Sequence, residues 1–354
     1  MNIIKKTFKY GPRIFINNIL PHYFVSHPSL SSFYYFLFSG KFEREQHAVL
    51  QGKVKHLKEQ KSKKSNYYTL VRNIHRIEKG LLMRPRRPVF ALDYIEETTN
   101  AFLHLNDNSY IKVAQYKWFK DVLTEYFSTT QGHPKIERLA TRFQESLKKS
   151  EEDILCGNGK SIPYKRIEAE KPDIAYDEFY KLTRYRRSVR WFLKQPVPRH
   201  LIDKAILAAS QAPSACNRQP FEYFIIDDPD LLKEVVKLPM GIKGYEKGIP
   251  MLIVIVGNLD AYFDERDRHV IYIDASLANM TMMYALETMG LSSCSINWPD
   301  MEGLERKMER LLKLKKHQRP LMCMAVGYPD PEGMVAFSEK RNLDQLRKYN
   351  LTNS

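Results

Sequence analysis

Cysteine is scarce in this chain, and the spacing of the few cysteines excludes two classes of protein. Only four occur among 354 residues, namely Cys156, Cys216, Cys294 and Cys323. None stands in a Cys-x-x-Cys pair, so the sequence matches neither a disulfide framework nor a cysteine-based zinc site. This predicts a protein of a reducing compartment, without a metal site.

Long hydrophobic runs are also missing. The richest apolar stretch, FYYFLF at residues 33–38, is far shorter than the roughly 20 residues that a membrane-spanning helix needs. The basic N-terminus is not followed by a cleavage site of the Ala-x-Ala type. We therefore expect a cytoplasmic protein, and peripheral contact with the inner face of a membrane stays open as an alternative.

Acidic residues are nearly absent from the first quarter of the chain. Residues 1–90 contain 18 Lys and Arg but 4 Asp and Glu, which accounts for +14 of the formal charge of +15. Such a segment attracts acidic lipid, nucleic acid or an acidic partner, or else it is an ordinary solvated surface. Helix-turn-helix, zinc-finger and RNA-binding signatures are missing, so we expect no specific nucleic-acid partner.

Composition and periodicity divide the chain into three regions. Residues 1–90 are basic and aromatic-rich, with an expected exposed helix in the lysine-rich stretch 52–65 and an amphipathic helix over 67–82. Residues 91–170 contain two or three further helices and a linker. Residues 171–354 alternate helices with apolar strand candidates, which is typical of α/β or α+β domains. One strand is expected right after residue 220, buried in the core.

The first motif with chemical meaning is RYRRSVRWF at residues 184–192. It gathers Arg186, Arg187, Ser188 and Arg190 at one predicted turn. So many guanidinium groups repel one another unless an anion lies between them, and a guanidinium fork grips phosphate through two parallel hydrogen bonds. A solvated basic turn is the alternative interpretation.

The second motif is the loop QAPSACNRQP at residues 211–220. A nucleophilic role for Cys216 would need a nearby base, and no histidine lies close to it in the sequence. The better interpretation is a rigid loop that presents Ser214, Asn217 and Gln219 to a ligand, with Pro213 fixing its backbone.

Two weaker motifs follow. GLSSCSINWPD at residues 290–300 ends a long helix at a glycine and continues as a short strand of small residues toward Asn297. A strand then ends in VGYPDP, and the basic pair Lys340 and Arg341 lies downstream. Ordinary helix-strand and surface connections would look the same, so neither motif identifies a site alone.

The order and spacing of these four motifs together resemble the nitroreductase family of flavoenzymes, over roughly residues 176–350. The resemblance implies an α+β fold with a mixed or antiparallel central sheet flanked by helices, and here a mainly helical N-terminal extension precedes it. It also implies FMN bound at the interface of an obligate homodimer. The residues that it assigns to the cofactor are Arg186, Arg187, Ser188, Arg190, Pro213, Ser214, Asn217, Gln219, Ile296, Asn297, Lys340 and Arg341.

The activity that this resemblance implies is hydride transfer from NADH or NADPH, through the N5 atom of FMN, to a small acceptor. The cofactor carries the chemistry, so no acid-base residue is assigned. NIHRIEKGL at residues 73–81 is similar to a segment of longer family members that are associated with bacterial surface-polysaccharide synthesis. Two alternatives stay open: an FMN-dependent dehydrogenase of a carrier-bound precursor, and a non-catalytic flavin-binding accessory protein of a membrane assembly.

Overall fold

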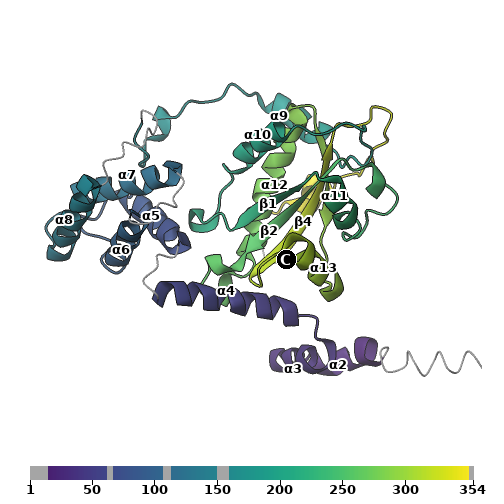
Figure 1. Cartoon of the computed structure of the whole chain (residues 1–354), viewed down its shortest axis with the longest axis horizontal. Coiled ribbons are helices and arrows are strands. Elements are labelled where there is room, and N and C mark those ends of the chain that lie inside the picture. Colours follow the sequence, from purple (N-terminus) through teal and green to yellow (C-terminus); the bar gives the residue numbers. More distant parts are fainter. Residues whose placement is uncertain (1–14, 62–66, 107–112, 150–158, 351–354) are drawn as a thin grey trace, which may run out of the picture.

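The computed structural model describes residues 15–61, 67–106, 113–149 and 159–350. The helices of residues 67–149 lie to one side of a sheet that is formed by the C-terminal half, and the helices of the first described residues lie below it (Figure 1). The long helix α4 (Glu43–Lys61) runs along the lower end of the sheet and links the two parts. No described helix is both long enough and apolar enough to cross a membrane.

In the part of the chain that the structure describes, the C-terminal half is built on one four-stranded antiparallel sheet. Its strands are β1 (Phe221–Ile226), β2 (Met251–Asn258), β3 (Ser292–Asn297) and β4 (Gln318–Gly327). They lie in the order β1-β2-β4-β3, so that β1 and β3 are the two edges. The registers pair Phe221 with Gly257, Met251 with Val326 and Ser292 with Gly327.

Helices cover both faces of this sheet. Ile253 and Ile255 of β2 pack with α10 (Arg199–Ala209) and α12 (Val270–Thr288) in one core. Alternate β2 residues, including Val254, pack in a second core with α11 (Pro229–Val235) and α13 (Glu302–Leu312). All eight residues of β2 are buried, which explains why this strand is continuously apolar from Met251 to Val256 instead of alternating.

Four helices of the N-terminal half share a separate apolar core. They are α5 (Tyr67–Leu81), α6 (Ile95–Asn106), α7 (Val113–Thr129) and α8 (Pro134–Lys149). Their buried side chains run from Leu70 of α5 to Phe143 of α8. The chain approaches itself closely at Gly80, where a Cβ atom would lie 2.2 Å from the ring of Phe90. The boundaries at residues 90 and 170 stay proposals, and this core favours grouping residues 67–149 together.

Helix α4 is docked against the end of the sheet by charge and by close packing. A Cβ atom on Gly52 would lie 2.6 Å from the backbone of Leu259, so the glycine permits the approach. Lys53 Nζ lies 2.8 Å from Glu265, and His56 Nδ1 lies 2.9 Å from the Asp260 carbonyl oxygen. The expected helix in the lysine-rich stretch is confirmed up to Lys61, but the expectation that it is exposed is wrong along this side. Residues 62–65 of that stretch lie outside the described part.

The first described residues form an aromatic-rich helical segment, which we call the N-terminal segment (residues 15–42). It contains α2 (Leu20–Phe24) and α3 (Pro28–Tyr34), flanked by short π-helical turns. Tyr23 is 71% exposed and Phe36 is 74% exposed, although both are large apolar side chains. In Figure 1 this segment projects beyond the body of the protein, at the end of α4.

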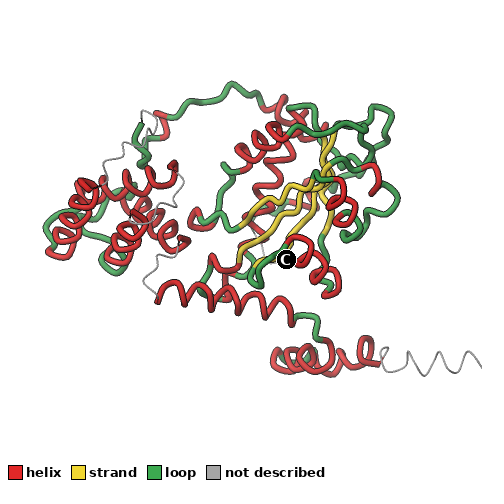
Figure 2. The backbone as a smooth tube through the Cα atoms, viewed as in Figure 1, coloured by secondary structure: helices red, strands yellow, loops and turns green. Residues whose placement is uncertain are grey.

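The α+β expectation is confirmed, with the antiparallel arrangement of strands. The predicted helix over 67–82 and the helices between 92 and 150 are confirmed as α5 to α8. The expectation of a buried first strand is only partly met, because β1 is an edge strand in which Ile226 alone is fully buried. After β4 the tail continues as an extended loop before the short α14 (Leu343–Leu346), as Figure 2 shows.

Candidate functional site

The basic motif lies along the β3 edge of the sheet, directly after α9 (Tyr176–Tyr185). Ser188 forms an isolated parallel bridge with Ser293 of β3. The amide of Val189 donates a hydrogen bond to the Ser293 carbonyl oxygen at 3.1 Å. A second bridge, between Phe192 and Pro329, ties the motif to the end of β4. These backbone contacts fix the position of the arginines relative to the sheet.

The arginines meet the C-terminal tail in a small pocket, which we call the basic pocket. Its volume is about 100 Å³, and its lining residues are Arg186, Arg187, Ser188, Arg190, Ala336, Ser338 and Lys340. The structure therefore brings Lys340 to the four residues of the basic motif, and Arg341 does not line the pocket. Three guanidinium groups, one ammonium group and hydroxyl groups surround this small volume.

The cations of the basic pocket lack counter-ions within the described residues. None of Arg186, Arg187, Arg190 and Lys340 forms an ion pair with a described carboxylate. The Nε atom of Arg186 is buried without a hydrogen-bond partner, and Arg190 Nη1 donates to the Ser188 carbonyl oxygen at 3.2 Å. A buried unpaired donor is costly, and like charges repel, so this arrangement fits a bound oxyanion.

The carboxyl group of Glu287 interacts electrostatically with Arg186 of this pocket. Burial raises the pKa of Glu287 from 4.5 to about 7, while a hydrogen bond from Ser292 and the charge of Arg186 oppose that rise. The Ser292 hydroxyl lies 3.1 Å from Glu287 Oε2. Near neutral pH a substantial fraction of Glu287 is therefore protonated, and the charge of Arg186 remains available to an anion.

The loop of residues 213–219 lies at the opposite edge of the sheet, just before β1. Cys216, Asn217 and Gln219 have positive φ angles of 54°, 53° and 49°. Residues other than glycine hold such angles only where the surroundings impose them, and such positions cluster at ligand sites. Gln219 Nε2 also donates to Asn217 Oδ1 at 3.0 Å, so the two side chains share one orientation.

A buried carboxylate on α12 holds this loop. Asp274, which is 3% exposed, accepts hydrogen bonds from the Ser214 hydroxyl at 2.6 Å and from the Ala215 amide at 3.0 Å. The Ser214 oxygen in turn accepts from the Gln219 amide at 2.7 Å. The sequence analysis missed Asp274, although a carboxylate in the first half of a mostly apolar helix was a usable signal.

The remaining predicted residues lie on β3 and at its end. Ile296 is 4% exposed and contributes its side chain to the core, so its backbone alone can face a ligand. Asn297 is exposed at the last position of the strand. Trp298 follows and is anchored by a hydrogen bond from its Nε1 to Glu305 Oε1 at 2.5 Å. Pro213 lies in the loop at the other edge.

The predicted site residues are thus divided between two places in one chain. The basic pocket and Ile296–Asn297 belong to the β3 edge, whereas Pro213, Ser214, Asn217 and Gln219 precede β1 at the other edge. Two strands, β2 and β4, separate these edges, and neighbouring strands lie about 4.8 Å apart. The sequence grouped all these residues as one site, and a single chain does not bring them together.

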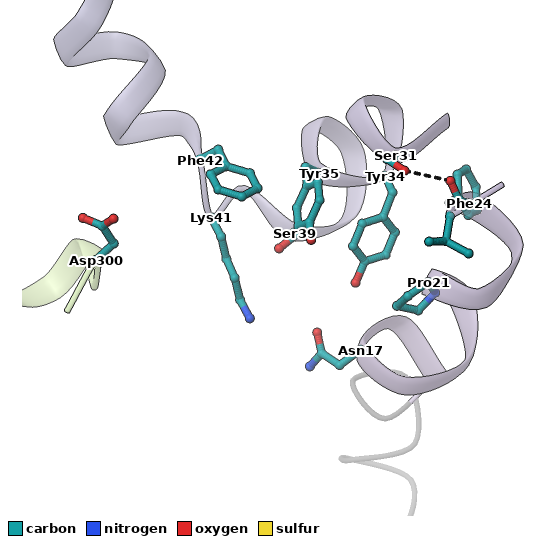
Figure 3. Close-up of a pocket in the computed structure, with 11 residues that line it drawn as sticks. Asn17, Pro21, Phe24, Ser31, Tyr34, Tyr35, Ser39, Lys41, Phe42 and Asp300 are labelled. Carbon is teal, nitrogen blue, oxygen red and sulfur yellow. Dashed lines mark hydrogen bonds between the residues drawn. The ribbon is translucent and has the colours of Figure 1, made fainter. Parts of the chain in front are cut away.

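Two other pockets lie elsewhere. The larger, with a volume of about 450 Å³, is formed mainly by the N-terminal segment, with Lys41 and Asp300 at its side (Figure 3). The other, of about 260 Å³, lies between α4, α5 and the sheet end and includes Asp260 and His317. Among the described residues no cluster of His, Cys, Asp and Glu could hold a metal ion.

The extension contributes to the surroundings of the loop. Helix α5 contacts the short 3-10 turn Ala215–Asn217, and Arg72 of α5 lies near Arg218, which follows that turn. Neither arginine was identified from the sequence. Arg218 stands between residues that were assigned to the loop, while Arg72 lies about 145 positions earlier in the chain, and only folding reveals that they are neighbours.

Comparison with known proteins finds the same family that the order of the motifs resembles. Residues 183–243 and 245–328 match the model of the nitroreductase family. Over these residues the C-terminal half of this chain is similar to the nitroreductase family. The match begins at α9 and ends at β4, and it includes the basic motif, the loop and β3.

Curated relatives of this domain are deiodinases. Iodotyrosine deiodinase 1 of Pongo abelii is 29% identical over 197 residues, which are 48% of this chain and 67% of that protein. Iodotyrosine deiodinase of Haliscomenobacter hydrossis is 23% identical, over 51% of this chain and 93% of that protein. Both alignments leave about half of this chain unmatched.

Among solved structures, an FMN-dependent nitroreductase of Clostridium difficile is 23% identical, with a TM-score of 0.41 over 48% of this chain and 98% of that one. The nitroreductase NfrA1 of B. subtilis is also 23% identical, with a TM-score of 0.44 over 49% of this chain and 74% of that one. The assignment of the nitroreductase-like fold rests on the family match and on the four-stranded sheet.

Proposed function

We propose that the protein is an FMN-dependent oxidoreductase that holds the FMN phosphate in the basic pocket. The observation that carries this proposal is the group of cations without counter-ions around about 100 Å³, with Arg186 Nε buried and unpaired. A phosphate group offers several oxygen acceptors to guanidinium forks, an ammonium group and the Ser188 hydroxyl. The similarity of this domain to the family supports the same cofactor.

FMN, when bound, supplies hydride transfer at its N5 atom, and we propose NADH or NADPH as donor and a small molecule as acceptor. The protein's own residues bind and orient. Arg186, Arg187, Arg190 and Lys340 hold the phosphate, and the backbone at Ile296–Asn297 lies beside the ring. We assign the Ser214–Gln219 loop to the polar edge of the flavin.

We further propose that the flavin site is shared between two copies of the chain. The loop and the basic pocket lie at opposite edges of the sheet, so a second copy can supply the loop. Helix α12 supports this arrangement because Ile273 and Leu277 are 56% and 45% exposed, although the opposite side of the helix is core. In the tail, Met334 is 87% exposed. Exposed apolar side chains of this kind mark interfaces.

Mixing two defective variants tests the shared site. Arg186→Ala removes a phosphate ligand, and Asn217→Ala alters the loop, so each homodimer carries two defective sites. In a random mixture half of the dimers combine both variants, and each of those has one intact site, so about a quarter of the normal activity returns. If the mixture, after unfolding and refolding together, gains nothing over the separate variants, the shared site is wrong.

The absorbance of the purified protein tests the function itself. Flavin bands that bleach within seconds when NADH or NADPH is added without oxygen support the reductase and identify the donor. Bands that persist favour the two alternatives: a dehydrogenase of a carrier-bound precursor, or a flavin-binding accessory protein without turnover. Absence of flavin after incubation with FMN would contradict the proposal.

The names of the relatives guide the choice of acceptor. Because the curated relatives are iodotyrosine deiodinases, halogenated phenols belong in the first assay panel beside quinones and nitroaromatics. A role in surface-polysaccharide synthesis is supported only by the resemblance of residues 73–81. Turnover of a halogenated phenol with release of halide, but none of quinones, would favour the deiodinase-like acceptor.

We also propose that the N-terminal segment contacts an anionic membrane surface. Residues 1–42 contain Lys5, Lys6, Lys9, Arg13 and Lys41 and no Asp or Glu. Many of the segment's large apolar side chains are exposed, and aromatic rings also line its pocket (Figure 3). Exposed aromatic side chains in a stretch of sequence that is rich in basic residues and lacks acidic ones are typical of interfacial binding.

Vesicle sedimentation tests this contact. We expect the whole protein to bind vesicles of phosphatidylcholine and phosphatidylglycerol, and not vesicles of phosphatidylcholine alone. The variant Tyr23→Ser/Phe36→Ser should weaken binding roughly tenfold or more, since each buried aromatic ring contributes about 1.5–3 kcal/mol. Tyr349→Ser, at a residue that is 75% exposed in the tail, is the matched control. Equal binding of both variants would contradict the proposal.

A further inference from the structure

Arg218 is a buried arginine that forms no ion pair with the residues that the structure describes. Its side chain is 6% exposed, and its Nε atom is buried without a hydrogen-bond partner. The guanidinium lies 4.8 Å from the centre of the Tyr262 ring, which favours a cation but does not neutralise it. Asp274 interacts with it electrostatically, yet its carboxylate already accepts hydrogen bonds from the Ser214–Ala215 stretch.

A second arginine, from the extension, interacts electrostatically with Arg218. Arg72 stands in the middle of α5, on the helix that contacts the Ala215–Asn217 turn. Burial lowers the pKa of Arg72, and the charge of Arg218 lowers it further. Arg72 Nε donates to Asn73 Oδ1 at 3.2 Å. Glu97 favours the charge of Arg72 from a distance, but its carboxylate accepts from Asn73 Nδ2 at 3.1 Å instead.

The pair has the electrostatic character of an anion site. Two guanidinium groups that are both largely removed from water repel each other, and neither forms an ion pair with a described carboxylate. Burying an uncompensated charge is costly. An oxyanion between the two would offset both costs, because each guanidinium fork can donate two hydrogen bonds to it.

We infer that Arg72 and Arg218 together bind an anionic group, a carboxylate or a phosphate, on the acceptor of the enzyme. The inference rests on the proposed function, in which the Ser214–Gln219 loop borders the flavin. The pair adjoins that loop, so an acceptor held there by its anionic end lies next to the reacting ring. The extension thereby contributes to substrate choice, and acceptors of similar shape without the charge bind less well.

Binding of three ligands of similar shape to the whole protein tests the inference. Calorimetry with 4-nitrobenzoate, 4-nitrophenyl phosphate and the neutral 4-nitrobenzamide needs no turnover. We expect at least one anionic ligand to bind ten times or more as tightly as the amide, and the better one shows whether carboxylate or phosphate is preferred. Equal affinity for all three, or no binding of either anion, would overturn the inference.

Variants then identify the residue responsible. Arg72→Gln should abolish the preference for the anion and leave binding of 4-nitrobenzamide unchanged, whereas Arg72→Lys should keep part of it. Arg76→Gln is the matched control, because Arg76 lies one turn along α5 and its guanidinium is taken up by Asp93 at 3.5 Å and by the Tyr94 ring at 3.6 Å. A preference that survives Arg72→Gln would overturn the role of this pair.

The anion preference of Arg72 and Arg218 can be tested separately from the proposed oxidoreductase function. A protein that lacks flavin, or that never oxidises NADH or NADPH, contradicts the proposed oxidoreductase. The calorimetric preference for an anion, and its loss in Arg72→Gln, can be read in either case.

Discussion

The two edges of the sheet carry the two parts of the candidate site, and they are built differently. At the β3 edge the basic pocket is formed by a contiguous motif and the tail. Its cations form no ion pair with a described carboxylate. At the β1 edge the loop is already held by hydrogen bonds, with Asp274 at their centre. The basic pocket is therefore organised to bind an anion, whereas the loop is organised to keep one conformation.

This difference predicts different consequences of mutation. Changes in the basic pocket should affect affinity for an anion and leave folding intact, because its cations contribute little to the core. Changes at the loop should affect stability and the geometry of the site, because the buried carboxylate joins the loop to α12.

The largest effect is expected from Arg186→Ala/Lys340→Ala. Each hydrogen bond to a charged group contributes about 1.5–3 kcal/mol, so the two changes together should weaken FMN binding roughly 100-fold or more. Titration of FMN fluorescence measures the affinity, and thermal unfolding without FMN should be unchanged. Arg184→Ala removes an arginine of the same motif that does not line the pocket; a similar loss in that control would break the distinction between the edges.

Asp274→Ala should have the next largest effect, on the unfolding free energy. It leaves the Ser214 hydroxyl and the Ala215 amide without their acceptor, which we expect to cost about 2–3 kcal/mol of unfolding free energy. Denaturant unfolding measures this loss. Asp267→Ala, at a partly exposed residue whose ion pair with Arg266 is 3.9 Å long, should cost less than about 1 kcal/mol. Wild-type stability in Asp274→Ala would show that the loop is not held as described.

Gly52→Ala tests whether the extension is tightly seated on the sheet end. The added Cβ atom would meet the Leu259 backbone at 2.6 Å, and overpacking of this kind costs about 1–3 kcal/mol. Limited proteolysis should then cut near α4 faster than in the unchanged protein. Gly303→Ala is the control, since its helix leaves the Cβ free and alanine favours helix. Equal protection in both variants would contradict the docking of α4.

The smallest effect concerns pH. Because burial raises the pKa of Glu287 in the folded state to about 7, the folded state holds this proton more tightly than the unfolded one. The unfolding free energy therefore falls as pH rises from about 4.5 to 7. Glu287→Gln should remove this fall, which we put at about 1–2 kcal/mol because solvent reaches part of the side chain. Stability curves that keep the same slope in the variant would contradict the raised pKa.

Local patterns predicted most of the elements. The 3.6-residue spacing of Leu70, Ile74 and Ile77 gave α5, and the apolar run at residues 251–258 gave a strand that both faces of the sheet bury. The sequence analysis passed over α11 and α13. The first is only seven residues long, and the second is a highly charged helix whose apolar side is narrow.

The limits of local pattern are clearest around the loop. Its turn residues were recognised, but the partner that holds it, Asp274, stands in a helix about 60 positions later. Arg72 is separated from Arg218 by more than 140 positions. Periodicity describes which residues share a face of one element, and it contains no information about which elements meet.

The sequence by itself determined most of the types of element, the basic motif and its likeness to the nitroreductase family, because these depend on neighbours along the chain. The pattern alone left α/β and α+β open, and the likeness to the family implied the α+β class. The tertiary structure decided that Lys340 joins the arginines, that the loop lies at the opposite edge of the sheet, and that α5 brings Arg72 to Arg218. Those outcomes depend on strand order and helix packing, which bring together residues that lie far apart in the sequence.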